Sequence, residues 1–180
     1  KPKFDIRYTE GFTRFTAVPE FVDAPTYMEL SNEALTTRGQ TPRYTQEDID
    51  MTRSGADPYL YPNIDWMKIL FKDFGRNRTA NANISGGSDM AVYYVGLSYY
   101  GEDGLYKVDR RHDYNANTSY ARYSVTSNLT LKPHKTTEIK LGIQGYLANA
   151  NYPAASNSTI FGAAFATQPN YIFPVYPNGY

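Results

Sequence analysis

The residues best able to carry out acid–base or metal chemistry are few and scattered. His112 and His134 are the two histidines, and each lies in a predicted loop or turn without a second histidine or an acidic pair at ligand spacing. We interpret both as surface residues and expect no metal site. The chain has no cysteine, which excludes disulfides, thiolate zinc sites and cysteine nucleophiles.

Two other sequence features suggest hydrolase chemistry only at first sight. Glu102 and Asp103 are adjacent within residues 101–104, a Gly-Glu-Asp-Gly stretch typical of a turn. Glycoside hydrolysis needs two carboxylates that face each other across a substrate, which sequence neighbours rarely do. Residues 85–88, Ser-Gly-Gly-Ser, lack the Gly-x-Ser-x-Gly nucleophile elbow and indicate a hairpin turn instead. We therefore expect no catalytic residue, no cofactor and no enzymatic activity.

Aromatic residues in predicted loops are the better binding candidates. Tyrosine and tryptophan rings can stack on sugar rings or fill pockets on a partner protein. The candidate ligand-binding residues are Tyr61, Trp66, Tyr152 and Tyr176. An aromatic girdle at a membrane interface, or packing within the loops, is the competing interpretation and is favoured for any single residue.

The composition indicates a β-sheet protein. Eighteen tyrosines and nine phenylalanines accompany many Asn, Ser and Thr residues, which suits strands with one aromatic and one polar face. Basic and acidic residues balance at 18 each, so nothing favours nucleic acid as a partner. No run approaches the roughly 20 apolar residues of a membrane-spanning helix. The chain opens at Lys1 without Met or a signal region, and we expect it to begin inside a longer protein.

Five segments alternate apolar and polar residues with the period of a β-strand. They are residues 3–18, 76–85, 90–100, 121–131 and 137–148. Gly11 marks a change of phase in the first segment and predicts a bulge there. Each of the last four segments is close to the roughly 9–11 residues with which a tilted barrel strand crosses a bilayer.

The connections alternate strictly between long and short. Long loops are predicted at residues 19–75, 101–120 and 149–180, and short turns at residues 86–89 and 132–135. Outer-membrane barrels place short turns on the periplasmic side and long loops outside, whereas a soluble sandwich has no reason to separate them. The first loop should contain helices at residues 23–36, 45–51 and 66–71, the second starting at a Thr45 cap.

The apolar phase of the strands predicts which residues face lipid. The predicted lipid-facing residues are Ala80, Ala82, Ile84, Tyr93, Val95, Leu97, Val125, Leu129, Leu131, Ile139, Leu141 and Ile143. Three Asn-x-Ser/Thr sequences, at Asn77, Asn83 and Asn128, fall in the polar phase and are interpreted as hydrophilic lumen lining.

Five strands cannot close a barrel, since about eight are the minimum. The fold class predicted is therefore all-β with short loop helices, in which antiparallel up-and-down strands form part of a large transmembrane β-barrel. Residues 1–180 would be an incomplete portion of that domain. Alone in water, its open edges and apolar face should prevent a stable monomer.

Several motifs together resemble the SusC/RagA family of TonB-dependent outer-membrane transporters. They are residues 61–66 (Tyr-Pro-Asn-Ile-Asp-Trp), the Phe71-Lys72 pair, residues 81–88 (Asn-Ala-Asn-Ile-Ser-Gly-Gly-Ser), the tyrosine-rich strand 93–99, residues 101–104, and residues 173–179 (Phe-Pro-Val-Tyr-Pro-Asn-Gly). In that family they correspond to the first barrel strands just after the plug domain.

The resemblance implies nutrient import across the bacterial outer membrane. It implies a SusD-like surface lipoprotein and the TonB system as partners, the latter through parts absent from this chain, and a glycan or peptide as ligand. It implies contact with outer-membrane lipid and no catalytic residue. The alternative of another class is a secreted, soluble β-sandwich that binds carbohydrate.

Overall fold

The computed structural model describes residues 1–108 and 114–176. The chain divides into two compact units. We call Lys1–Phe15 with Lys72–Ala154 the sheet unit, and Thr16–Phe71 with Ala155–Tyr180 the helical unit. His112 lies outside the described residues.

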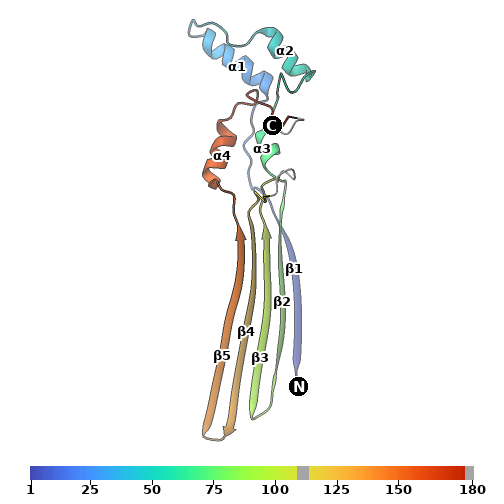
Figure 1. The fold of residues 1–180 in the computed structure, drawn as a ribbon, viewed down its shortest axis with the longest axis vertical. Helices are drawn as coiled ribbons and strands as arrows, with labels where there is room; N and C mark the ends of the chain where they lie inside the picture. The colour runs from blue at the N-terminus through green and yellow to red at the C-terminus, as the bar shows by residue number, and fades with distance from the viewer. Residues whose placement is uncertain (109–113, 177–180) are drawn as a thin grey trace. The chain divides into compact units, whose positions relative to one another are not determined.

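The sheet unit is one antiparallel sheet whose strands follow chain order, as Figure 1 shows. Its strands are β1 (Lys3–Thr13), β2 (Gly75–Gly87), β3 (Ala91–Asp103), β4 (Ser119–His134) and β5 (Thr137–Asn151). Each strand pairs with the next, and β1 and β5 are the two edges. This is the all-β, up-and-down arrangement predicted from the sequence.

The register places all twelve predicted lipid-facing residues on one face of the sheet. Opposed residues share a face, as in the row in which Ile6 pairs with Ala82, Leu97 and Val125. Many of these side chains are solvent-exposed; Ile143, for example, is 67% exposed. The other face carries Asn77, Asn83 and Asn128 in the polar phase, as expected. One face is thus apolar and uncovered, and the other is hydrophilic.

Strand ends differ from the sequence prediction. β1 ends at Thr13 instead of residue 18, and it pairs with β2 without interruption through Gly11 and Asn77, so the predicted bulge at Gly11 is wrong. β2, β3, β4 and β5 all extend beyond their apolar cores. Residues 101–103, predicted as part of a turn, belong to β3.

The two short turns connect β2 to β3 and β4 to β5. The first is closed by backbone hydrogen bonds between Ser88 and Ala91, with 2.7 Å from the Ser88 nitrogen to the Ala91 oxygen. Gly86 and Gly87 pair with Tyr93 and Val92 in the ladder, so the predicted glycine turn lies one or two residues too early. The second turn joins His134 to Thr137. All long connections leave from the opposite end of the sheet.

Three glycines in β2 and β3 lie under tyrosine rings. A Cβ atom on Gly96 would come within 2.8 Å of the Tyr94 hydroxyl, and one on Gly86 within 2.6 Å of the Tyr93 hydroxyl. Gly101 lies under Tyr99 in the same way. The Tyr94 hydroxyl also donates to Asn83 Oδ1 at 3.0 Å across the strands. The missing side chain lets each ring lie flat on the sheet.

The helical unit holds α1 (Ala24–Thr36), α2 (Gln46–Ser54), α3 (Trp66–Leu70) and α4 (Asn157–Ala166). The first three correspond to the predicted helices. α4 falls within the long connection predicted at residues 149–180, where the sequence analysis predicted no helix. Its apolar residues surround the helix on all sides, so they do not give a one-sided helical period.

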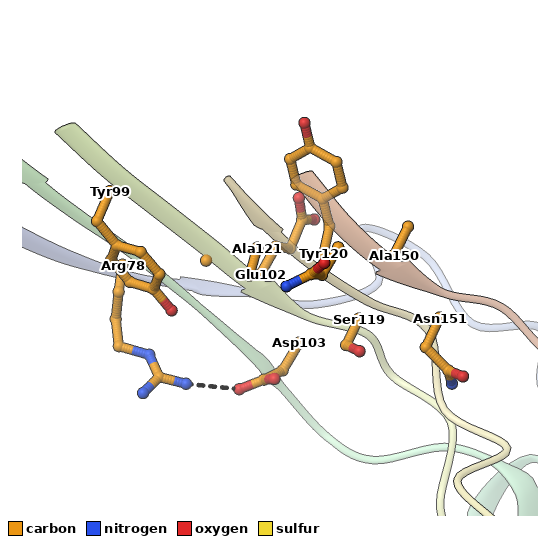
Figure 2. Close-up of a pocket in the computed structure, with 11 residues that line it drawn as sticks. Arg78, Tyr99, Glu102, Asp103, Ser119, Tyr120, Ala121, Ala150 and Asn151 are labelled. Carbon is orange, nitrogen blue, oxygen red and sulfur yellow. Dashed lines mark hydrogen bonds and ion pairs between the residues drawn. The ribbon is translucent and has the colours of Figure 1, made fainter. Parts of the chain in front are cut away.

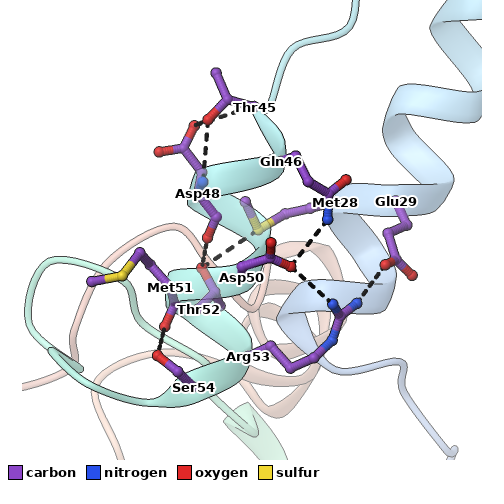
Figure 3. Close-up of polar contacts among 10 residues, drawn as sticks. All are labelled: Met28, Glu29, Thr45, Gln46, Asp48, Asp50, Met51, Thr52, Arg53 and Ser54. Atoms are coloured by element: carbon purple, nitrogen blue, oxygen red, sulfur yellow. Dashed lines mark hydrogen bonds and ion pairs between the residues drawn. The ribbon is translucent and has the colours of Figure 1, made fainter.

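Helices α1 and α2 pack through a small core and a polar rim. Met28 and Ile49 are buried between them, and the Thr52 hydroxyl lies 3.7 Å from the Met28 sulfur. At the rim, Arg53 pairs with Glu29 of α1 and with Asp50 of its own helix (Figure 3). Thr45 and Asp48 form the reciprocal capping box that fixes the start of α2. Among the described residues, no helix is long and apolar enough to cross a bilayer.

The β2–β3 hairpin provides a stability test. A Cβ atom on Gly87 would lie 2.5 Å from the Ala91 oxygen and 2.8 Å from the Val92 Cα, whereas one on Gly145 would meet only Val125 Cγ1, at 4.0 Å. We expect Gly87→Ala in the full-length protein to lower stability by about 1–3 kcal/mol, because backbone must move. Gly145→Ala is the control. Heat- or urea-dependent loss of the folded species on a gel measures both, and equal stability of the two variants would contradict the hairpin geometry.

Candidate functional site

A pocket of about 540 Å³ in the helical unit is lined by Trp66, one of the predicted binding residues. Its aromatic walls are Phe21 before α1, Tyr27 on α1, Trp66 at the start of α3 and Phe165 near the end of α4. Phe21 and Phe165 lie 5.5 Å apart between ring centroids. Three segments that are distant in sequence, residues 21–27, 63–68 and 164–169, therefore supply one aromatic cavity.

Hydrogen bonds between these segments fix the walls. The Trp66 indole N–H donates to the Gln168 carbonyl at 3.1 Å, and the Ile64 backbone N–H donates to the Pro169 carbonyl at 2.9 Å. The Ala24 backbone N–H donates to Asn63 Oδ1 at 2.9 Å. Phe71 stacks on Phe161 at 4.8 Å, which ties the end of α3 to α4. The pocket is preorganised by side chains and backbone of its own unit.

Two carboxylates give the pocket its polar character. Asp23 caps α1, and the Thr26 hydroxyl and backbone N–H hold the pKa of its carboxyl below the ordinary value. Asp65 caps α3. Burial acts to raise the Asp65 pKa, but hydrogen bonds and charge from Lys68, whose Nζ lies 3.1 Å from Asp65 Oδ2, outweigh it and lower the pKa. Both groups are therefore anionic acceptors at neutral pH.

A second aromatic group in the same unit contains Tyr59, Phe173 and Tyr176. The Tyr59 ring lies 4.7 Å from Phe173 and 5.9 Å from Tyr176, and the last two rings are 5.9 Å apart. Each of the three rings thus contacts the other two; Phe173 and Tyr176 are half-buried, and Tyr59 is 44% exposed. This agrees with loop packing as one role for the loop aromatics.

The structure separates the four predicted binding residues. Trp66 lines the pocket and Tyr176 joins the second aromatic group. Tyr61 is half-buried and lies in neither of these groups, and Tyr152, just after β5 in the sheet unit, is 67% exposed. Ligand binding by any of the four stays a prediction.

Phe21, Tyr27 and Phe165 were not predicted as site residues. Phe21 and Phe165 are single aromatics in stretches without an obvious motif, and they meet only because the end of α4 returns beside α3. The Trp66–Gln168 hydrogen bond spans about a hundred residues, so no local pattern reports it. The one usable signal was the Ser156 cap, whose side chain accepts from the Thr159 N–H and starts α4.

The chemistry available here is binding. Aromatic faces pack against sugar rings or apolar side chains, and anionic acceptors take hydroxyl or ammonium donors. Among residues 1–108 and 114–176, no three His, Asp or Glu residues cluster as metal ligands. His134 is exposed at the end of β4, with Nδ1 2.9 Å from the Thr136 hydroxyl. Glu102 and Asp103 point to opposite faces of β3, where Glu102 accepts from the Tyr100 hydroxyl and Asp103 pairs with Arg78.

Comparison with known proteins agrees with this architecture. No family model matches the chain. It is 23% identical over 177 residues to TonB-dependent receptor P26 of Formosa agariphila, a match that covers 98% of this chain and 15% of the relative. The chain thus spans a small part of the length of the protein it matches. The match supports the resemblance to SusC/RagA-type TonB-dependent transporters stated above.

Two solved structures share the fold. One is the RagAB peptide importer in the closed-closed state, with a TM-score of 0.63, 18% identity and coverage of 99% of this chain and 21% of that chain. The other is the RagAB peptide transporter, with a TM-score of 0.66, 17% identity and coverage of 100% and 22%. The likeness extends over both units of the chain.

The Asp23 cap predicts a pH dependence of α1. Because the folded-state pKa is lowered, the cap stabilises the helix above the unfolded-state pKa of about 4, and this stability is lost as pH falls through the folded value. Asn also caps well but does not titrate. In the full-length protein, amide exchange at Thr26 and Tyr27, corrected for intrinsic rates, should accelerate several-fold below pH 4 in the wild type and not in Asp23→Asn. The same acceleration in both would exclude the cap as its cause.

Proposed function

We propose that this chain forms part of the β-barrel wall of a SusC/RagA-like, TonB-dependent importer in the bacterial outer membrane. The observation that carries the proposal is the two-faced sheet: an exposed, nearly continuous apolar face and a hydrophilic face on the same five strands. In a barrel the first face contacts lipid and the second lines the lumen.

The height of the apolar face fits this role. On β5 it runs from Ile139 to Leu147, and the polar Asn149 follows in the same phase. That stretch measures about 26 Å along the strand, or roughly 20 Å across a bilayer at a 40° tilt, which is near the height of the apolar band of outer-membrane barrels. Short turns at one end of the sheet and long connections at the other add the asymmetry of such barrels.

Recognition is assigned to the long connections and the helical unit. The long connections from β1 to β2, from β3 to β4 and after β5 would be extracellular. The pocket and aromatic groups of the helical unit would contact the solute or a SusD-like lipoprotein. The solute is a glycan or a peptide; the RagAB structures are those of a peptide importer. Energy would come from the TonB system through segments outside this chain.

The soluble-sandwich alternative requires a second sheet packed on the apolar face. The described residues form one five-stranded sheet, and its apolar side chains are exposed. A carbohydrate-binding sandwich of this chain would leave that face in water, at a large cost in apolar exposure. In a barrel, membrane lipid would cover this apolar face.

Spin labels test the lipid contact in the reconstituted full-length protein. Labels at Leu97, Val125 and Ile143, in the middle of the apolar face, should be reached by oxygen and shielded from a water-soluble nickel complex. The matched controls are labels at the next residues, Ser98, Thr126 and Gln144, which face the other side. Nickel access to all six positions, or protection of the first three from both reagents, would contradict the proposal.

Substitution of pocket aromatics tests recognition. We expect Trp66→Ala to reduce growth on the imported nutrient or co-purification of the lipoprotein by about tenfold, since an anchoring aromatic contributes on the order of 1–2 kcal/mol. Trp66→Phe should retain more of both activities than Trp66→Ala, because it keeps an aromatic ring. Tyr171→Ala is the control, because Tyr171 is 73% exposed and outside the pocket lining. If Trp66→Ala leaves both activities intact while barrel-assembled variants of the short turns lose them, the assigned orientation is wrong.

A further inference from the structure

At the end of the sheet from which the long connections leave, the rows of opposed residues change from apolar to polar. The last row that lacks charged and amide side chains on all five strands joins Tyr8, Ala80, Tyr99, Tyr123 and Leu147, and beyond it only Phe12 of β1 adds a large apolar side chain in this phase of the strands. The next row in the same phase joins Glu10, Arg78, Gly101, Ala121 and Asn149. Within two residues the face changes from tyrosine and leucine to charge and amide.

The tyrosine row has the chemistry of a membrane interface. Tyr99 and Tyr123 lie 5.0 Å apart between ring centroids on neighbouring strands. Tyr8 and Tyr123 are 60% and 52% exposed, so their rings are available to lipid. An apolar ring with a polar hydroxyl is favoured where hydrocarbon meets headgroups.

The charges beyond this row are paired on the same face. Arg76 donates to Glu10 of β1, with 2.7 Å from Nε, and Arg78 Nη2 donates to Asp103 Oδ2 at 2.8 Å. Charged groups on a lipid-facing surface cost several kcal/mol at the bilayer midplane and little near the interface. Four charges in two rows therefore belong outside the hydrocarbon layer.

A groove of about 320 Å³ lies where the two kinds of row meet, as Figure 2 shows. Tyr99 forms its apolar side, and Arg78, Asp103 and Ser119 supply polar groups, with Asn149 and Asn151 on β5. The groove thus offers an apolar ring for an acyl chain beside donors and an acceptor for a headgroup.

We propose that this groove binds the polar headgroup of an outer-leaflet lipid, and that the boundary between hydrocarbon and headgroups crosses the sheet between the Tyr8–Tyr99–Tyr123 row and the Glu10–Arg78–Asn149 row. The inference rests on the proposed barrel function and specifies which lipid layer each row contacts. Arg78 and Asp103 together are neutral, so the pair suits a headgroup that carries both acceptors and donors, such as a phosphate beside hydroxyl or amine groups.

Depth measurements on the full-length protein in phospholipid vesicles test the boundary. Spin labels at Tyr123 and Leu147 should be reached mainly by oxygen, and labels at Ser119 and Asn149 mainly by the nickel complex. The oxygen-to-nickel ratio should thus reverse within four residues on β4 and within two on β5. A label at Ala148, on the opposite face, should show no such lipid signature. Oxygen-dominated access at 119 and 149 would overturn the inference.

A pair of double variants tests the role of the polar row. Arg78→Leu with Asp103→Leu should extend the apolar band, and the label at Asn149 should then lose nickel access and gain oxygen access. Arg7→Leu with Asp5→Leu replaces the same two residue types on the other face of β1, outside the groove lining, and should leave that label unchanged. If oxygen and nickel access at the Asn149 label is unchanged in both double variants, the inference is overturned. Heat-dependent gel mobility must first show that each variant is folded. If a variant is not folded, the oxygen and nickel access of the Asn149 label in the otherwise wild-type protein decides whether the inference holds.

This experiment separates two failures. If labels at Leu97 and Val125 are reached by the nickel complex, the barrel function itself is wrong. If these central labels contact lipid but the ratio does not reverse between Leu147 and Asn149, only the boundary and its headgroup groove are wrong.

Discussion

The continuous hydrogen-bonded register of the five strands is the constraint on which the rest of the structure depends. From the β1–β2 pair to the β4–β5 pair no residue is inserted until the irregularity between Leu131 and His134, close to the last turn. A single inserted residue would transfer every following side chain to the other face. The uninterrupted ladder therefore satisfies the backbone and, at the same time, collects the apolar residues on one surface.

The same constraint explains why the faces were predictable and the strand ends were not. Alternation through Ile139, Leu141 and Ile143 depends only on neighbouring residues, so the sequence alone assigns the face. Beyond the apolar band both phases are polar, as at Glu102 and Asp103, and alternation disappears although pairing continues. Gly11 illustrates the converse: a glycine that breaks the pattern but leaves the ladder intact, because it simply pairs with Asn77.

The helical unit was predictable where its signals are local. The Asp23 and Thr45 caps and the apolar residues that follow them lie within a few positions, and α1 and α2 form where expected. The pocket depends on the return of residues 164–169 beside Asn63 and Trp66, which no local pattern encodes. Helix α4 also lacks a polar face, and its segment therefore resembles an apolar loop in sequence.

The glycines beneath tyrosine rings have a consequence for how such a sheet changes over evolution. Gly96 and Tyr94 occupy one shared volume, as do Gly101 and Tyr99, and Gly86 and Tyr93. A side chain gained at the glycine would displace the ring, and loss of the ring would expose bare backbone. Neither member is free to vary alone, so we expect substitutions at these positions to occur in compensating pairs. Two of the pairs lie two residues apart on β3, and the third, Gly86 with Tyr93, is a cross-strand pair whose covariation would mark β2 and β3 as neighbours.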